Sequence, residues 1–174
     1  MDEKRQPETR SLSAVALADG KKLDRYFVGL GLKRAQHELR LAINAELEAL
    51  GTNISHVNVL REIEQHPGVS SADLARLAFL TAQTLGQQVI QMQERGLVER
   101  RAGDGRKIRH YLSASGEKLL AGAMKKVREI DTQVLSDFSD DELAALLDTF
   151  QTIERRAAAV RADAKRFAPV VVEP

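Results

Sequence analysis

The apolar positions between residues 70 and 95 recur with a helical period and predict two short helices joined by a sharp turn. Ser70 stands three residues before Asp73, a capping-box pattern that favours the start of a helix. Thr81 begins a second helical pattern after only two intervening residues, Phe79 and Leu80. Its apolar positions recur at steps of three and four residues, namely Leu85, Val89 and Met92. The stretch therefore predicts a helix-turn-helix.

Beyond Gly96 the pattern changes to that of a two-stranded hairpin. Two short runs, 97–101 and 107–112, flank the turn signal at residues 103–105. The positive side chains of the segment outnumber the two negative ones, Glu99 and Asp104; they are Arg95, Arg100, Arg101, Arg106 and Lys107. Since the whole chain has a net charge of only +1, this hairpin is locally cationic. A cationic hairpin attached to a helix-turn-helix is typical of a DNA-binding winged helix.

Long helices are predicted on both sides of this unit. A helical pattern ends at Gly51, and Asn53 can cap a further helix that stops before Pro67. On the C-terminal side a helix begins at Ser113 or Ser115, and a capping box at residues 139–142 precedes another. The apolar faces of the terminal helices are too extensive for a compact winged helix to cover. They therefore need either an intramolecular helical layer or a second copy of the chain.

The fold class predicted is mainly α, a winged helix-turn-helix with a small β-hairpin wing and long terminal helices in a dimerisation layer. The 174 residues, of which 43% are hydrophobic, suffice for one sizeable core. The expected segments are a disordered or partly helical extension (1–19), a dimerisation helix (20–51), the winged helix-turn-helix (52–113), C-terminal dimerisation helices (114–168) and a tail (169–174).

These elements resemble the MarR (multiple antibiotic resistance regulator) family of winged-helix repressors over roughly residues 53–120. The resemblance rests on Leu74-Ala75, Thr81, Thr84 and the runs 94–100, 104–106 and 112–116, in the same order and spacing. It implies that Arg106 reaches a minor groove while Asp104 holds it by an ion pair. It also implies pairing of two copies and a small-molecule inducer, often aromatic or acidic, in the crevice between the dimerising helices and the winged helix.

If the second helix is the recognition helix, its N-terminal end enters the major groove. Gln83 and Gln87 are the best candidates for reading bases, because glutamine can bond adenine through two hydrogen bonds. Residues 81–93 contain no Lys or Arg, so affinity for phosphates must come from elsewhere. The candidate contacts to double-stranded DNA, on a pseudo-palindromic operator, are Ser70, Arg76, Thr81, Ala82, Gln83, Thr84, Gly86, Gln87, Arg95, Asp104, Arg106 and Lys107.

Polar residues on the first long helix and on the next one are candidates to line an inducer pocket. They are Tyr26, His37, Arg40, Asn44, His56 and Arg61. They could equally be surface or inter-helix hydrogen-bonding residues, and Tyr26 could simply pack. A ligand would act by favouring a spacing of the two recognition helices that no longer matches one turn of duplex.

Composition limits the other classes of function. The chain has no cysteine, which excludes disulfides, thiolate metal sites and regulation by cysteine oxidation. Its four histidines sit apart, with no His-x-x-x-His pair, so no metal or cofactor is expected. No phosphate-binding glycine loop or nucleophile elbow is present, so catalysis is not expected. With no signal peptide and no long apolar run, the expected location is the cytoplasm.

The sequence thus predicts a homodimeric DNA-binding regulator, a repressor released by a small inducer. One alternative is a winged-helix adaptor that binds protein and not DNA. Another is a small enzyme or metal-dependent switch, which would need a bound cofactor or metal.

Overall fold

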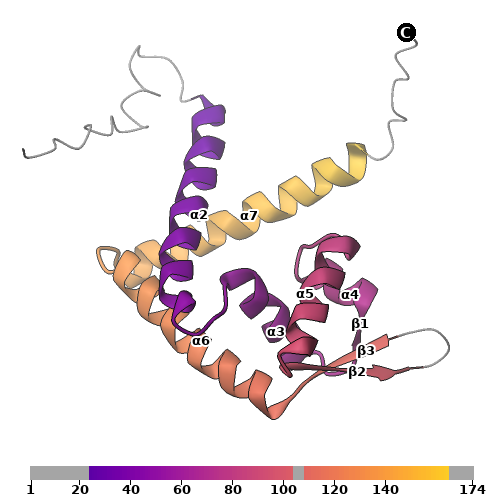
Figure 1. The fold of residues 1–174 in the computed structure, drawn as a ribbon. Coiled ribbons are helices and arrows are strands. Elements are labelled where there is room, and N and C mark those ends of the chain that lie inside the picture. The colour runs from indigo at the N-terminus through magenta and orange to yellow at the C-terminus, as the bar shows by residue number, and fades with distance from the viewer. Residues whose placement is uncertain (1–23, 104–107, 165–174) are drawn as a thin grey trace, which may run out of the picture. The chain divides into compact units, whose positions relative to one another are not determined.

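The structure is a computed structural model that describes residues 24–103 and 108–164. These residues form two units, the first ending at Asp131 and the second beginning at Thr132. The helices are α2 (Arg25–Glu48), α3 (Ile54–Gln65), α4 (Ser71–Leu77), α5 (Ala82–Glu94), α6 (Ala114–Val134) and α7 (Asp140–Ala164). The strands are β1 (Val69–Ser70), β2 (Val98–Ala102) and β3 (Ile108–Leu112), as Figure 1 shows. The predicted class, mainly α with a winged helix-turn-helix, is confirmed.

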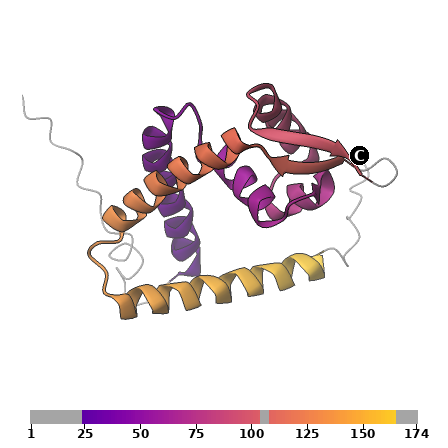
Figure 2. The same cartoon turned by 90° about the horizontal axis from the view of Figure 1, so that it is seen from below.

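The wing belongs to a three-stranded antiparallel sheet in the order β1-β3-β2. Strands β2 and β3 pair over their full length, with Arg100 opposite His110, and they form the ribbon visible in Figure 2. Strand β1 adds Val69 opposite His110 on the other edge. This third strand was not predicted, because two residues carry no readable alternation and their pairing depends on β3. The sheet lies against α3, α4 and α5.

Side-chain caps define the start of each helix of the helix-turn-helix. The Ser70 hydroxyl accepts the Asp73 N–H at 3.2 Å and donates to the Asp73 carboxylate at 2.7 Å. Thr81 Oγ1 accepts the Thr84 N–H at 3.1 Å. Both predicted starts are confirmed, as is the Asn53 cap on α3, where Oδ1 accepts the His56 N–H at 3.0 Å. These short polar contacts fix where the chain turns.

The turn between α4 and α5 has one unusual residue. Phe79 has a φ of +55°, and within the described residues it is the only non-glycine residue with a positive φ. A left-handed conformation costs a residue with a Cβ about 1–2 kcal/mol. The Leu80 N–H donates to the Ala75 carbonyl at 2.8 Å and closes the turn. The backbone hydrogen bonds therefore hold a conformation that glycine would adopt without strain.

One apolar core joins the winged helix to parts of α2 and α6. Leu47 from α2, Leu120 from α6 and the helix-turn-helix residues Leu74, Leu85 and Met92 are all buried in it. The N-terminal half of α2 and the described side chains of α7 contribute no buried residue. Several large apolar side chains of these two helices are exposed instead, namely Tyr26, Val28, Leu32, Leu147, Phe150, Ile153 and Val160.

The start of α6 ties the wing to the end of α5. The Ser113 hydroxyl accepts the Gly116 N–H at 3.0 Å and donates to the Gly96 carbonyl at 2.6 Å, so Ser113 and not Ser115 begins this helix. The Ser113 N–H donates to the Leu97 carbonyl at 3.1 Å. Gly116 is buried at this junction, where a Cβ would collide with the Leu97 carbonyl oxygen. Only glycine fits there without a shift of the backbone.

Gly116→Ala is expected to lower the free energy of unfolding by about 1–3 kcal/mol, because the new methyl group meets a backbone atom. Gly122→Ala, on the same helix with nothing within 4 Å of its Cβ position, is the matched control. It should raise the free energy of unfolding by about 0.5–1 kcal/mol through helix propensity. Urea unfolding measures both free energies. If both substitutions shifted the free energy of unfolding in the same direction, the close contact between Gly116 and the Leu97 carbonyl would be contradicted.

Candidate nucleic-acid interface

Burial of one face fixes the rotation of α5 and exposes the other. Leu85, Val89 and Met92 are buried, as the sequence predicted. The N-terminal half also presents four exposed residues: Ala82 and Gly86 border the buried face, and Gln83 and Gln87 lie further round the helix. Within the described residues no hydrogen bond engages the amide of Gln83 or Gln87, whereas the Gln88 amide donates to Ser55 Oγ at 2.7 Å. The two predicted readers are therefore available to an external partner.

The other candidates near the start of α5 have partners within the chain. The hydroxyls of Thr81 and Thr84 lie 2.8 Å apart, and that of Ser70 caps α4. The exposed Arg76 guanidinium pairs with Asp73, one turn earlier on α4. Exposed ion pairs contribute little stability, about 0–1 kcal/mol, so Arg76 can exchange its partner for a phosphate at small cost.

Arg95 lies at the opposite end of α5, about 20 Å along the helix from Ala82. Its side chain reaches the connection between α2 and α3, where Nη2 lies 3.7 Å from the point that a Cβ atom would occupy if Gly51 carried one. Its charge also lowers the pKa of His56. The structure thus separates Arg95 from the exposed side chains at the start of the helix. The wing candidates Asp104, Arg106 and Lys107 lie outside the described residues.

Strand β2 of the wing carries two arginines, Arg100 and Arg101. Arg101 pairs with Glu99 at 2.7 Å and stacks over the Tyr111 ring, with its guanidinium carbon 4.4 Å from the ring centroid. Arg100, on the opposite face of β2, has its Nη1 atom 3.5 Å from Gln93 Oε1. These contacts hold the strands that lead to the wing tip.

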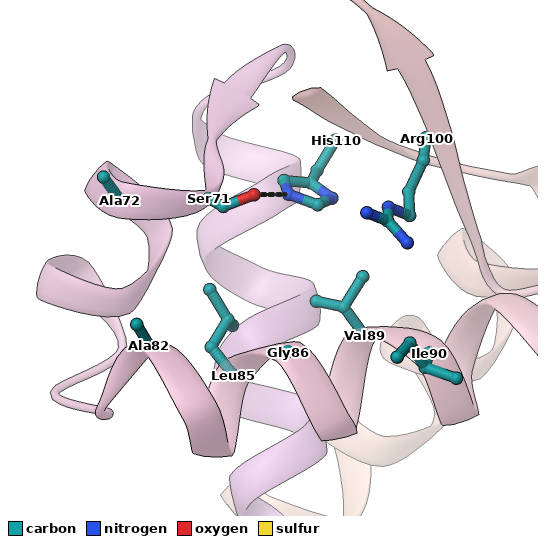
Figure 3. A pocket seen from close by; sticks show the side chains of 9 residues that line it. All are labelled: Ser71, Ala72, Ala82, Leu85, Gly86, Val89, Ile90, Arg100 and His110. Carbon is teal, nitrogen blue, oxygen red and sulfur yellow. Dashed lines mark hydrogen bonds between the residues drawn. The ribbon is translucent and has the colours of Figure 1, made fainter. Parts of the chain in front are cut away.

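A pocket of about 330 Å³ lies between α4, α5 and the wing strands (Figure 3). His110 and Arg100 face it from the strands, while Leu85 and Val89 form its apolar floor on α5. His110 is 1% exposed, its Nε2 atom is 2.9 Å from Ser71 Oγ, and its Nδ1 atom has no partner within the described residues. Burial, and secondly the Arg100 charge, hold the pKa of His110 below 6.5.

In the sequence His110 is only one of four histidines that sit apart. Its burial could have been inferred from its position in the hairpin, because alternate residues of β3 face the helices. That position could be assigned only once the register between β2 and β3 was known.

A second crevice, of about 460 Å³, lies between α2 and α3. Asn44 and His56 are the two predicted ligand residues that line it. The Asn44 side chain accepts the Ile54 N–H at 2.9 Å and so already supports the start of α3. Thr52 Oγ1 and His56 Nδ1 are buried without a hydrogen-bond partner in the described part of the chain. Burial and then Arg95 lower the pKa of His56, against a hydrogen bond from its ring to Gln91 that raises it.

The other predicted ligand residues do not line this crevice. Tyr26 is 69% exposed near the start of α2. His37 and Arg40 are exposed together, with Nδ1 and Nη2 3.5 Å apart. Arg61 pairs with buried Glu62 at 3.3 Å. The six candidates therefore do not form a single cluster.

Two other kinds of site are absent from the described residues. Among them, no three His, Asp or Glu side chains are grouped so that they could hold a metal ion. None of the described helices combines the length and the apolar character needed to cross a membrane.

The chain is similar to known transcriptional regulators. The MarR family model matches residues 50–107. The HTH-type transcriptional repressor Rv2887 of Mycobacterium tuberculosis is 35% identical over 111 residues, which cover 63% of this chain and 80% of the repressor.

Solved structures agree with this similarity. The crystal structure of the MarR family protein Rv2887 with p-aminosalicylic acid has a TM-score of 0.61 at 30% identity and covers 72% of this chain and 97% of that one. A complex of the same protein with salicylic acid has a TM-score of 0.60 at 31% identity, over 79% and 99% of the two chains. The Staphylococcus aureus MepR–DNA complex, 19% identical with a TM-score of 0.67 over 72% and 94%, shows the same fold.

The stability of the protein is expected to fall as the pH drops below 6.5, because His110 in the folded state resists protonation. Because the pKa of His110 is lower in the folded state, the unfolded chain binds a proton first as the pH falls. The stability that neutral His110 contributes is therefore fully present above pH 6.5, and it is lost as the pH falls toward the folded-state pKa. The slope from such a group is at most about 1.4 kcal/mol per pH unit. His56, with a pKa shifted the same way, adds to it.

His110→Gln should make the loss of stability at falling pH shallower. Thermal unfolding of the variant and the parent between pH 8 and pH 5 measures this loss. Parallel curves for the variant and the parent would contradict the assignment to His110. An NMR titration of the parent should likewise show the His110 ring protonating below pH 6.5.

Proposed function

Because the chain belongs to the MarR family of winged-helix transcriptional regulators, we propose that it is a homodimeric repressor that a small aromatic acid releases from its operator. The family consists of regulators and not of enzymes. The observation that carries the proposal is the exposed polar face on the N-terminal half of α5, which the core holds in place beside a cationic wing.

Gln83 and Gln87 are the residues that choose the DNA sequence. Both amides are exposed and unbonded within the described residues, and glutamine can donate to adenine N7 while it accepts from N6. Thr81, Ala82, Thr84 and Gly86 line the same end of the helix, where a small side chain permits close approach to a groove wall.

Attraction to the phosphates comes from outside α5, which contains no Lys or Arg. Arg76 stands on α4, Ser70 and Thr81 stand at helix starts, and Arg106 and Lys107 belong to the wing tip. Within this proposal Arg106 enters a minor groove beside the major groove that α5 occupies, with Asp104 as its ion-pair partner. Arg95, at the other end of α5, would reach a different part of the phosphate backbone.

Self-association is supported by the exposed apolar residues of α7, which recur at steps of three and seven: Leu147, Phe150, Ile153 and Val160. The first turn of α7 is acidic, with Asp140, Asp141 and Glu142, and its last turn contains basic Arg161. Antiparallel pairing with the α7 of a second copy would place opposite charges together. A two-fold dimer then offers two recognition helices to adjacent major grooves.

The crevice between α2 and α3 is the proposed inducer site. Thr52 and His56 supply buried polar atoms that lack partners, and Leu41 and Ala45 supply apolar wall. The Arg95 charge near His56 favours an acid over a neutral ligand. The complexes of Rv2887 with salicylic and p-aminosalicylic acid support this class of ligand. An occupied crevice would favour a different angle between α2 and α3, and hence a different spacing of the recognition helices.

Selection of bound duplexes from a random pool is expected to give two inverted half-sites whose centres lie about 10 base pairs apart. Gln87→Ala should relax the preference at one adenine of each half-site by about 1–3 kcal/mol. Gln133→Ala, an exposed glutamine on α6, is the matched control and should leave the selected sequence unchanged.

Binding to the selected duplex should weaken steeply as salt rises. Little duplex binding at any salt concentration would instead favour the adaptor function. Half-sites without inverted symmetry would contradict the dimer.

Salicylic acid is expected to release the parent protein from its selected duplex, as followed by fluorescence anisotropy. His56→Leu should raise the half-release concentration about tenfold, because it removes a hydrogen-bonding group from the crevice. His37→Gln, exposed on α2 outside the crevice, should leave that concentration unchanged. Equal shifts for both variants, or no release of the parent, would contradict the proposed site.

A further inference from the structure

Phe79 combines two unfavourable features at one position. Its side chain is 87% exposed, more than that of any other large apolar residue described. Its φ of +55° is a conformation in which a bulky residue is strained. A single exposed apolar side chain needs no explanation, and neither does a glycine with a positive φ in a turn. An exposed aromatic ring on a strained backbone position indicates a role outside the fold.

The ring contributes nothing to the core that surrounds the turn. The neighbours Ala78 and Leu80 pack against the buried cluster, whereas Phe79 does not. The turn itself is closed by the backbone, since the Phe79 N–H donates to the Arg76 carbonyl at 3.3 Å and the Leu80 N–H donates to Ala75. Glycine would make the same hydrogen bonds without the strain.

The position of Phe79 connects it to the recognition helix. It stands two residues before Thr81, the cap of α5, so the two Cα atoms are at most about 7 Å apart. When a helix enters the major groove with its N-terminus leading, the segment just before its cap meets the sugar–phosphate strand at the groove edge. The Arg76 side chain and the positive end of α5 make the same region attractive to a polyanion.

We propose that the Phe79 ring packs on the operator DNA, against a deoxyribose or a thymine methyl group at the edge of the major groove. The inference rests on the proposed function, because it requires α5 to be the helix that enters DNA. It assigns Phe79 the role of an apolar anchor beside the polar readers Gln83 and Gln87. The strain in the turn is then maintained for binding and not for folding.

Three substitutions in the full chain separate the ring from the strain. Phe79→Ala removes the ring but keeps a Cβ at positive φ, Phe79→Gly removes both, and Phe79→Tyr keeps both. Affinity for the duplex that the parent selects should fall about tenfold for the Ala and Gly variants and stay unchanged for Tyr. The melting temperature should rise by about 2–4 °C for the Gly variant alone.

The salt dependence of binding adds a readout that a general structural defect would alter. An apolar contact releases no counterions, so the slope of log affinity against log salt should be the same in the Ala variant and the parent. Parent-like affinity of the Ala and Gly variants would overturn the anchor and leave the proposed function intact. A parent that binds no duplex overturns both. A Tyr variant as weak as Ala would also contradict ring packing.

Discussion

The burial of one face of α5 is the constraint on which the rest of the winged helix depends. Leu85, Val89 and Met92 allow only one rotation of this helix about its axis, and the Thr81 cap and the left-handed Gly96 define its ends. The polar face is thereby held outward although its side chains add nothing to the core. Residues on that face are free of folding demands, so their identity can serve recognition alone.

The wing is oriented by contacts at its base. Strand β3 pairs on both sides, Arg101 covers Tyr111, and Ser113 joins the end of the hairpin to the end of α5. On the inner face His110 meets Ser71 at the start of α4. These contacts join the hairpin to α4 and α5, the elements that the proposed function places on DNA, so a ligand that shifted the helices would act on all three together.

The local features of this fold were predictable from sequence, and the features that need tertiary contacts were not. Caps at Ser70, Thr81 and Asn53 involve residues three positions apart, so their pattern is visible in the chain itself. Strand β1 and the buried state of His110 depend on the register of β3. The separation of Arg95 from Gln83 could in principle be derived from helix length, but which neighbour Arg95 meets depends on how α2 connects to α3.

The absence of Lys and Arg from α5 has a consequence for how such a regulator would respond to osmotic stress. Ions compete with protein for phosphates, but they do not compete for the edges of bases. Because the proposed base-reading side chains, Gln83 and Gln87, are neutral amides, a change in potassium concentration would change the affinity for every target by the same factor. The order of affinities among promoters would stay the same. Osmotic stress would therefore lower the affinity of the regulator for all of its targets without changing which target it prefers.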